Sequence, residues 1–370
     1  MKVFLFGTLL HPPLLDVVAG DALTKTPAEL AGWRVAGVPG DVYPVLVRDD
    51  ACVAQGAVVD PDQIGLDRMV HYEDAFGYHP IKVQVLVAGQ LSEALVFQPN
   101  GQGAAPFGDW SLDAWVVRAS ERAIYAAQEL MGYVGRFHGA ALEFRRPQAE
   151  ARAHSRVEAG AMVRPVVGSQ QQSGQVEVSS QGADHAGYFV TETVSLRHPR
   201  FDGGMSGEIT REVFVAAEAA ILLPYDPVRD RILLVEQFRM GPWRRGATYP
   251  WMLEPVAGRV DPGETPEQTA RREAMEEAGL ALSALEPIGS GYPTPGYSTE
   301  YFHVFLGICD LPDGIEGYHG QEDEDEDIRT HVLDWGQASD LLSRGEADNM
   351  PLVLALTWLS RERSRLRHLA

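Results

Sequence analysis

The residues best suited to chemistry are three glutamates in one short segment of the chain. Glu273, Glu276 and Glu277 stand at i, i+3 and i+4, so a helix would place their carboxylates on one face, about one turn apart. Three like charges this close repel each other and need a positive partner. Because residues 258–280 contain no Cys or His, a hard cation that prefers oxygen ligands, such as Mg²⁺, is the natural candidate.

Local signals predict the helix that carries these glutamates. Thr265 and Gln268 form a Thr-x-x-Gln capping box, and Pro266 occupies the first helical position. Gly279 supplies the signal that ends the helix. A charged, solvated surface helix without a metal is the alternative that these residues leave open.

The spacing of this segment resembles the signature of the Nudix hydrolases. The matching residues are Gly258, Glu264, Arg272, Glu273, Ala274, Glu276, Glu277, Gly279 and Leu280. The resemblance implies two or three Mg²⁺ ions, for which Mn²⁺ can substitute. It implies these metal ligands: Ala257 through its carbonyl, Glu273, Glu276 and Glu277. It also implies that Gly258, Glu264 and Arg272 are structural or orienting residues.

Several stretches outside this segment look like the ADP-ribose pyrophosphatases. They are 211–214, 223–227, 235–239, 251–258 and Pro295, which lies sixteen residues after Gly279. The resemblance covers about residues 188–358 and implies hydrolysis of ADP-ribose to AMP and ribose 5-phosphate. It implies that Arg211, Arg239 and Pro295 face the substrate. Ion pairs at strand ends are the alternative for the two arginines, and another sugar diphosphate is the alternative substrate.

An acidic run at residues 321–327 precedes a predicted strand that begins at Ile328. Alone, such a run is typical of a solvated charge cluster. In the family that the chain resembles, an equivalent loop closes on the substrate. The resemblance therefore implies that Glu324 is the general base and that Glu326 is a metal ligand.

The first hundred residues resemble the γ-glutamylcyclotransferase-like fold. The resemblance rests on Phe6 to Leu9, the strand 51–59, Glu73 and Tyr78. It implies that the turn at Gly7 binds an anionic carboxylate through backbone N–H groups and that Glu73 is the catalytic acid and base. Asp74 and Pro80 depart from the family pattern. A domain that only binds or packs is the alternative to this activity. For the whole chain, a γ-glutamyl cyclotransferase in which the Nudix domain is a nucleotide-sensing module is a further alternative.

The order of predicted elements indicates an α+β protein of two domains. Residues 1–160 are expected to form a smaller γ-glutamylcyclotransferase-like β-barrel/α domain that ends in helices. The Gly/Ser/Gln-rich segment 161–187 reads as a linker. Residues 188–370, with strands, a helix, strands and helices, fit a Nudix α/β/α sandwich. The last helix, from Met350, reads as a core-packing helix or, alternatively, a basic membrane or partner helix.

Composition limits the cellular compartment and the classes of partner that are expected for this protein. The 370 residues carry a formal net charge of −21, which argues against nucleic acid and anionic membranes as partners. The two cysteines, Cys52 and Cys309, form no metal or disulfide pattern, so a reducing cytoplasm is expected. No apolar run is long enough to span a membrane. The family resemblance implies a homodimer through residues 188–260.

Overall fold

The computed structural model describes residues 1–39, 42–99, 108–162, 167, 171–320 and 326–369. The chain divides into two compact units. The first comprises Met1–Gln170 with Ala186–Phe189, and the second comprises Gln171–His185 with Val190–Ala370.

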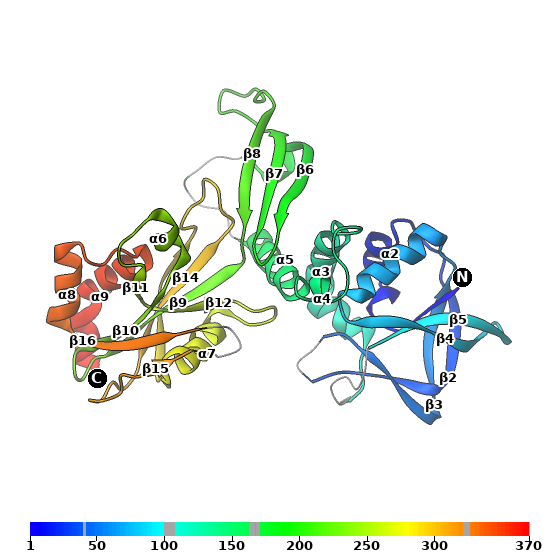
Figure 1. Ribbon diagram of the computed structural model, residues 1–370, viewed down its shortest axis with the longest axis horizontal. Coiled ribbons are helices and arrows are strands. Elements are labelled where there is room, and N and C mark those ends of the chain that lie inside the picture. Colours follow the sequence, from blue (N-terminus) through cyan, green and yellow to red (C-terminus); the bar gives the residue numbers. More distant parts are fainter. Residues whose placement is uncertain (40–41, 100–107, 163–166, 168–170, 321–325, 370) are drawn as a thin grey trace. The chain divides into compact units, whose positions relative to one another are not determined.

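A closed five-stranded barrel forms the centre of the first unit (Figure 1). In barrel order its strands are β1 (Val3–Leu5), β3 (Val45–Val59), β2 (Thr26–Ala36), β4 (Tyr78–Val87) and β5 (Gln90–Pro99). Its core contains the apolar side chains of Phe4, Leu30, Val58, Val85 and Val96. Closure pairs the edge strands with each other and confirms the predicted β-barrel domain.

Helices complete this unit. They are η1 (Thr8–Leu10), α1 (Pro12–Ala19), α2 (Gln63–Asp74), α3 (Leu112–Met131), α4 (Ala140–Glu143) and α5 (Arg146–Ala161). Helices α3, α4 and α5 follow the barrel strands in the chain. Helix α3 begins at the cap Ser111 and buries Trp115, Ala119, Ala123 and Leu130 at helical spacing.

Part of the predicted linker is a strand. β6 (Glu177–Ala186) joins β7 (Val190–Arg197) and β8 (Ile209–Val215) in a three-stranded sheet. Its side chains are almost all exposed, so the alternation of apolar and polar residues that signals a strand is missing. Polar pairs support it instead: the Gln181 amide donates to Glu192 over 2.7 Å, and the Thr193 hydroxyl donates to Asp184 over 2.6 Å.

The main sheet of the second unit has the order β13-β14-β9-β10-β16-β15, with β11 added beside β10 and β12 beside β9. Its strands are β9 (Glu218–Asp226), β10 (Arg231–Phe238), β11 (Trp251–Glu254), β12 (Val256–Arg259), β13 (Ala284–Gly291), β14 (Tyr301–Ile308), β15 (Tyr318–His319) and β16 (Ile328–Asp334). The predicted strand that begins at Ile328 is confirmed as β16.

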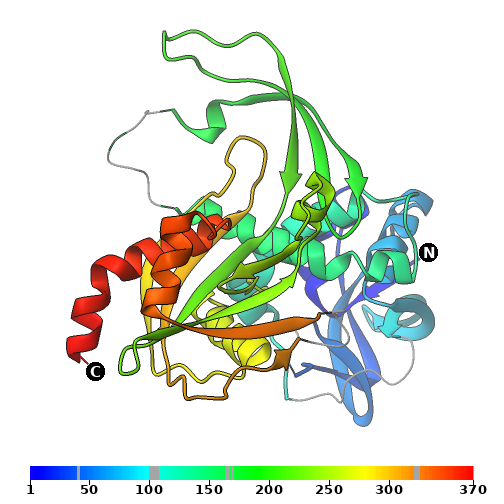
Figure 2. The same cartoon turned by 60° about the vertical axis from the view of Figure 1, so that its left-hand side comes forward.

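Helices cover both faces of this sheet (Figures 1 and 2). Helix α7 (Pro266–Ala278) lies on one face, and α8 (Trp335–Arg344) and α9 (Met350–Leu369) lie on the other. Successive residues of β9 point to opposite layers: Leu222 packs in the cluster of α7, and Leu223 packs in the cluster of α9. The second unit is therefore the predicted α/β/α sandwich.

The last helix packs on the core. Its apolar residues Leu352, Leu356 and Leu359 are fully buried, whereas Arg363 and Arg367 pair with Asp230. Within the described ranges, no helix is long and apolar enough to cross a membrane.

Candidate active site

Helix α7 presents the predicted metal-binding glutamates, and its ends form as expected. The Thr265 hydroxyl accepts a hydrogen bond from the backbone N–H of Gln268, and the Gln268 side chain accepts one from the N–H of Thr265. Gly279 has a left-handed backbone with φ of 63°, which glycine adopts without strain. Local interactions therefore set both ends of the helix.

Strand β12 lies against α7 where the glutamates emerge. A Cβ atom at position 258 would overlap the carboxylate of Glu273, so glycine is needed there. At the neighbouring position, the backbone N–H of Ala257 donates to Oε2 of Glu277 over 3.1 Å. The strand and the helix thus bring Ala257, Gly258, Glu273 and Glu277 together.

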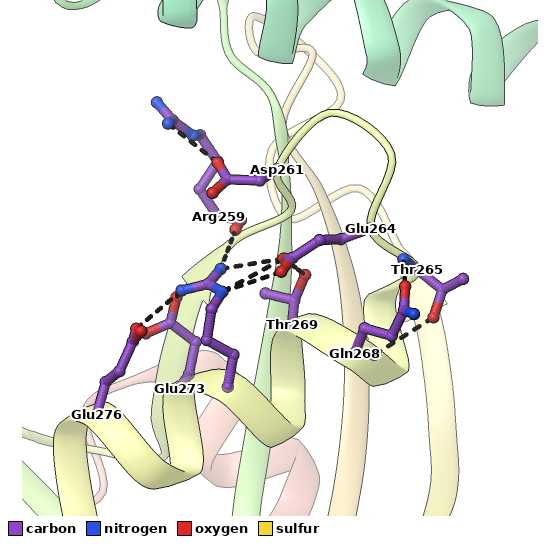
Figure 3. A network of polar contacts seen from close by, with 9 residues as sticks. Arg259, Asp261, Glu264, Thr265, Gln268, Thr269, Glu273 and Glu276 are labelled. Atoms are coloured by element: carbon purple, nitrogen blue, oxygen red, sulfur yellow. Dashed lines mark hydrogen bonds and ion pairs between the residues drawn. The ribbon is translucent and has the colours of Figure 1, made fainter. Parts of the chain in front are cut away.

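The guanidinium of Arg272 contacts three glutamates around this point (Figure 3). Nη1 donates to Glu273 over 2.6 Å and to Glu276 over 2.9 Å. Nε donates to Glu264 over 3.1 Å, and the Thr269 hydroxyl donates to the second oxygen of Glu264 over 2.8 Å. A planar group with five donors can hold several carboxylates in one arrangement. These contacts suit the orienting role predicted for Arg272.

Burial makes ionisation of the two inner glutamates unfavourable. Glu277 is 3% exposed, and burial raises its pKa to about 8. Burial also raises the pKa of Glu273 to about 7, against the opposing charge of Arg272. Negative charge on Glu326 adds to the rise at both residues. A bound cation would reverse this penalty, so this set of oxygen donors fits a divalent metal ion.

Glu276 and Glu273 accept hydrogen bonds from the same guanidinium nitrogen, Nη1 of Arg272. As they stand, no three Asp, Glu, His or Cys side chains in the described part of the chain converge as a metal site. The fit to a metal therefore rests on Glu273, Glu277 and the adjoining backbone of Ala257. Glu273 and Glu276 both accept from Arg272, so each would have to share or exchange that contact to bind the ion.

Arg239, predicted to face the substrate, lies at the end of β10 and precedes α6 (Met240–Arg245). Its Nε donates to Oε2 of Glu254 over 2.5 Å. Its positive charge opposes the rise in the pKa of Glu277. Arg239 is therefore close enough to Glu277 on α7 for their charges to interact.

Arg211 and Pro295 lie on connected segments. Arg211 is exposed on β8, and its guanidinium donates to the adjacent Thr210 carbonyl over 2.8 Å. Pro295 is exposed in the loop between β13 and β14. That loop is tied to the end of β8, because the Thr299 hydroxyl accepts from the N–H of Ala216 and donates to its carbonyl. Among the described residues, Arg211 forms no ion pair with a glutamate of α7.

The acidic run is only partly described. Glu326 is half-buried two residues before β16, and its negative charge raises the pKa of Glu273 and Glu277. Glu324, the predicted general base, lies outside the described residues.

Gly7 and Glu73 line one cavity of the first unit, with a volume of about 50 Å³. Its walls are mainly aromatic and include Phe4, Phe6, Tyr43, Tyr72, Phe76 and Tyr78. Burial raises the pKa of Glu73 to about 8. No ion pair reaches its carboxyl from the residues that the structure describes. A carboxyl with a pKa near neutrality has both forms available near that pH, so its ionised form can accept a proton and its neutral form can return it.

The structure gives a local reason for Gly7 and for Asp74, which is one of the two departures from the family pattern. A Cβ at Gly7 would lie 2.7 Å from Cγ of Pro44, so the turn has room only for glycine. Asp74 accepts a hydrogen bond from the backbone N–H of Gly139 over 2.7 Å. Asp74 therefore has a structural partner of its own.

Sequence reasoning missed Glu254, which holds Arg239. Strand β11 pairs with β10 so that Glu254 lies opposite Val235, and a predicted hairpin between these strands could have suggested the contact. The second partner of Glu254 is Asn349, whose Nδ2 donates over 2.6 Å. That residue is too distant in sequence for any local pattern to reveal it.

Comparison with known proteins identifies both units. The NUDIX domain family matches residues 216–355, and the family described as gamma-glutamyl cyclotransferase, AIG2-like, matches residues 3–112. The ADP-ribose pyrophosphatase of Escherichia coli (strain K12) is 40% identical over 193 residues, which are 52% of this chain and 91% of that protein. The ADP-ribose pyrophosphatase of Haemophilus influenzae is 36% identical over 194 residues, 52% of this chain and 89% of that protein.

A more distant relative is the GDP-mannose pyrophosphatase of Escherichia coli O1:K1 / APEC. It is 31% identical over 172 residues, 46% of this chain and 88% of that protein. These similarities confirm both predicted resemblances and a pyrophosphohydrolase activity. The chain therefore belongs to the Nudix hydrolases, in the ADP-ribose pyrophosphatase family, and carries an N-terminal domain of the AIG2-like gamma-glutamyl cyclotransferase family.

Proposed function

We propose that this protein hydrolyses ADP-ribose to AMP and ribose 5-phosphate with bound Mg²⁺, for which Mn²⁺ can substitute. The observation that carries the proposal is the pair Glu273 and Glu277, of which Glu277 is buried, packed against Ala257 and Gly258. The 40% identity to an ADP-ribose pyrophosphatase supports the substrate. The relative that is a GDP-mannose pyrophosphatase makes another sugar diphosphate the alternative substrate.

Hydrolysis of a diphosphate needs neutralised phosphate oxygens and an activated water. When bound, two or three Mg²⁺ ions would supply both, by neutralising charge and favouring ionisation of the water. The residues that would hold them are Ala257 through its carbonyl, Glu273, Glu276, Glu277 and Glu326. Glu324 would accept the proton of the attacking water.

Two arginines would bind the anionic substrate. The chain has a net charge of −21, so a diphosphate needs local positive charge at Arg211 and Arg239. Pro295 would shape the loop that faces the rest of the substrate. The same negative charge supports a small molecule as partner and argues against nucleic acid.

The direct test is to incubate the protein with ADP-ribose and Mg²⁺ and to measure the released AMP by chromatography. We expect turnover that stops when EDTA removes the metal and returns with Mg²⁺ or Mn²⁺. GDP-mannose and other sugar diphosphates in parallel define the specificity. No AMP from ADP-ribose, or full turnover by Glu277→Gln, would overturn the proposal. Binding of ADP-ribose without hydrolysis would indicate a nucleotide-sensing module.

We also propose that the protein is a homodimer in the cytoplasm. Large apolar side chains are exposed within residues 188–260: Tyr188, Phe189, Phe201, Met205, Phe238, Met240, Trp243, Tyr249 and Trp251. Side chains of this type are enriched at protein interfaces, so they support association of two copies through this region. Cys52 and Cys309 are both free thiols, which suits a reducing compartment.

We propose a second function for the first unit, the cyclisation of a γ-glutamyl compound to 5-oxoproline. The cavity that joins Gly7 and Glu73 favours it. Glu73 would take a proton from the α-amine as that nitrogen attacks the γ-carbonyl carbon. It would return the proton to the amine that leaves when the original C–N bond breaks.

Release of 5-oxoproline from a panel of γ-glutamyl amines and γ-glutamyl amino acids tests this second function. We expect release by the wild type and none by Glu73→Gln. Glu93→Gln, which alters only a surface pair with Lys82, is the matched control. Release that persists in Glu73→Gln would remove this assignment.

A further inference from the structure

Glu254 is a nearly buried carboxylate at the end of β11, with 8% of its surface exposed. Its two oxygens have different partners. Oε2 accepts a hydrogen bond from Nε of Arg239 over 2.5 Å, and Oε1 accepts one from Nδ2 of Asn349 over 2.6 Å. A buried charge is costly unless both oxygens are satisfied, and here each oxygen has a donor.

Asn349 is itself held by the start of α9. Its Oδ1 accepts from the backbone N–H of Leu352 over 3.1 Å, and its carbonyl accepts from the N–H of Val353 over 3.0 Å. Leu352 is fully buried, so this end of the helix is embedded in the core. The amide oxygen caps the helix, and the amide nitrogen is thereby directed at Glu254.

Arg239 uses only part of its donor set in this contact. Glu254 takes Nε, and within the described residues no protein group accepts from Nη1 or Nη2. The side chain is 39% exposed, and its charge acts on Glu277 of the catalytic helix. An arginine fixed through Nε keeps two parallel donors available for a phosphate oxygen pair. Because its rotamer is already set, less entropy is lost when the ligand binds.

We propose that Glu254, held by Asn349, is a positioning residue that directs Nη1 and Nη2 of Arg239 toward a substrate phosphate beside Glu277. The inference rests on the proposed hydrolysis of a nucleoside diphosphate sugar and deepens it. It joins the start of α9 to the substrate through one chain of contacts. Neither Glu254 nor Asn349 touches the reacting atoms.

Kinetics with ADP-ribose and Mg²⁺ test the inference. Glu254→Gln removes the charge that fixes Arg239, and we expect kcat/KM to fall about 10- to 100-fold, as for other supporting contacts. Asn349→Ser keeps a helix-capping oxygen but lacks a donor that reaches Glu254, so a smaller loss in the same direction is expected. The double variant Arg239→Ala with Glu254→Gln should be no slower than Arg239→Ala alone, because both changes act through one guanidinium.

A matched control separates positioning from general damage. Glu286→Gln breaks another arginine–carboxylate pair, in which Arg365 donates to Glu286 over 2.6 Å on β13. We expect unchanged kcat/KM in this variant. Thermal unfolding of each variant shows whether it is folded. If Glu254→Gln does not fold, the kinetics of Asn349→Ser decide whether Glu254 positions Arg239.

Binding of inorganic diphosphate with Mg²⁺, measured by calorimetry, needs no turnover. We expect about 10-fold weaker binding in Glu254→Gln than in the wild type. Equal affinity in the two proteins, or losses that add in the double variant, would overturn the inference. A wild type that hydrolyses no sugar diphosphate would instead refute the proposed function, and the diphosphate affinities would still decide the role of Glu254.

Discussion

The carboxylate of Glu273 occupies the space that a side chain at Gly258 would need. The glycine lies on β12, and the glutamate lies one layer away on α7. The hydrogen bond from Ala257 to Glu277 flanks this contact. The backbone of β12 therefore forms one wall of the site, and its shape decides where Glu273 can lie.

Gly258→Ala should move Glu273 out of place without unfolding the protein. We expect kcat/KM for ADP-ribose to fall about 100-fold, because small displacements of catalytic groups have effects of this size. Gly207→Ala is the control, since a Cβ there meets nothing within 4 Å. Steady-state kinetics measure both variants. Normal kinetics in Gly258→Ala would show that Glu273 is not needed where the structure places it.

Glu277→Gln should separate activity from stability. In metal-free buffer near pH 7 the wild-type carboxyl is largely protonated, since burial raises its pKa to about 8, and an amide replaces a neutral carboxylic acid with little loss. We therefore expect the variant and the wild type to have a similar Tm in EDTA. We expect the turnover of the variant to be at least about 100-fold lower than that of the wild type. Added Mg²⁺ should raise the Tm of the wild type more than that of the variant. An equal rise in both proteins would contradict Glu277 as a ligand.

Glu73 should make stability depend on pH. The carboxyl has an ordinary pKa of 4.5 when unfolded and about 8 when folded, so folding takes up a proton between these values. Its contribution is complete below about pH 4.5 and is lost as the pH rises through about 8. One such group gives a slope of at most about 1.4 kcal/mol per pH unit, and less where water enters the cavity. Tm measured from pH 5 to 8 should fall more steeply in the wild type than in Glu73→Gln. Parallel curves would argue against the raised pKa.

Asp230 should anchor the last helix. It pairs with Arg363 and Arg367 and accepts from the Tyr225 hydroxyl over 2.8 Å. Asp230→Asn keeps a residue that tolerates the left-handed backbone, with φ of 59°, but leaves two arginines without their charge partner. We expect the free energy of unfolding to fall by about 2 kcal/mol, below the range for fully buried pairs. Urea denaturation measures it, and Asp340→Asn, an exposed pair with Arg344, should show no loss.

The homodimer is tested by light scattering, which should give twice the mass of one chain. A charge in the exposed apolar region should separate the copies, so Trp243→Glu is expected to give the monomer with an unchanged circular dichroism spectrum. A wild type that is monomeric at all concentrations would rule out the dimer.

Where an element depends on interactions within a few residues, the sequence was sufficient to predict it. The capping box at Thr265 and the glycine at 279 define α7, because their hydrogen bonds are made within a few residues. The i, i+3, i+4 spacing of its glutamates predicted one acidic face for the same reason. Strand β6 was missed, because its pairing with β7 depends on polar cross-strand contacts such as Gln181 with Glu192, and not on an apolar alternation.

Tertiary structure decided which residues meet at the site. By itself the sequence predicted a helix with three glutamates on one face, its two ends and the two family resemblances. It did not determine that Arg272 joins Glu264 to the glutamates of α7, that Glu273 needs the space above Gly258, or that Asn349 reaches Glu254. These contacts join separate strands and helices, and their geometry depends on how the layers of the sandwich pack, which no local pattern of residues encodes.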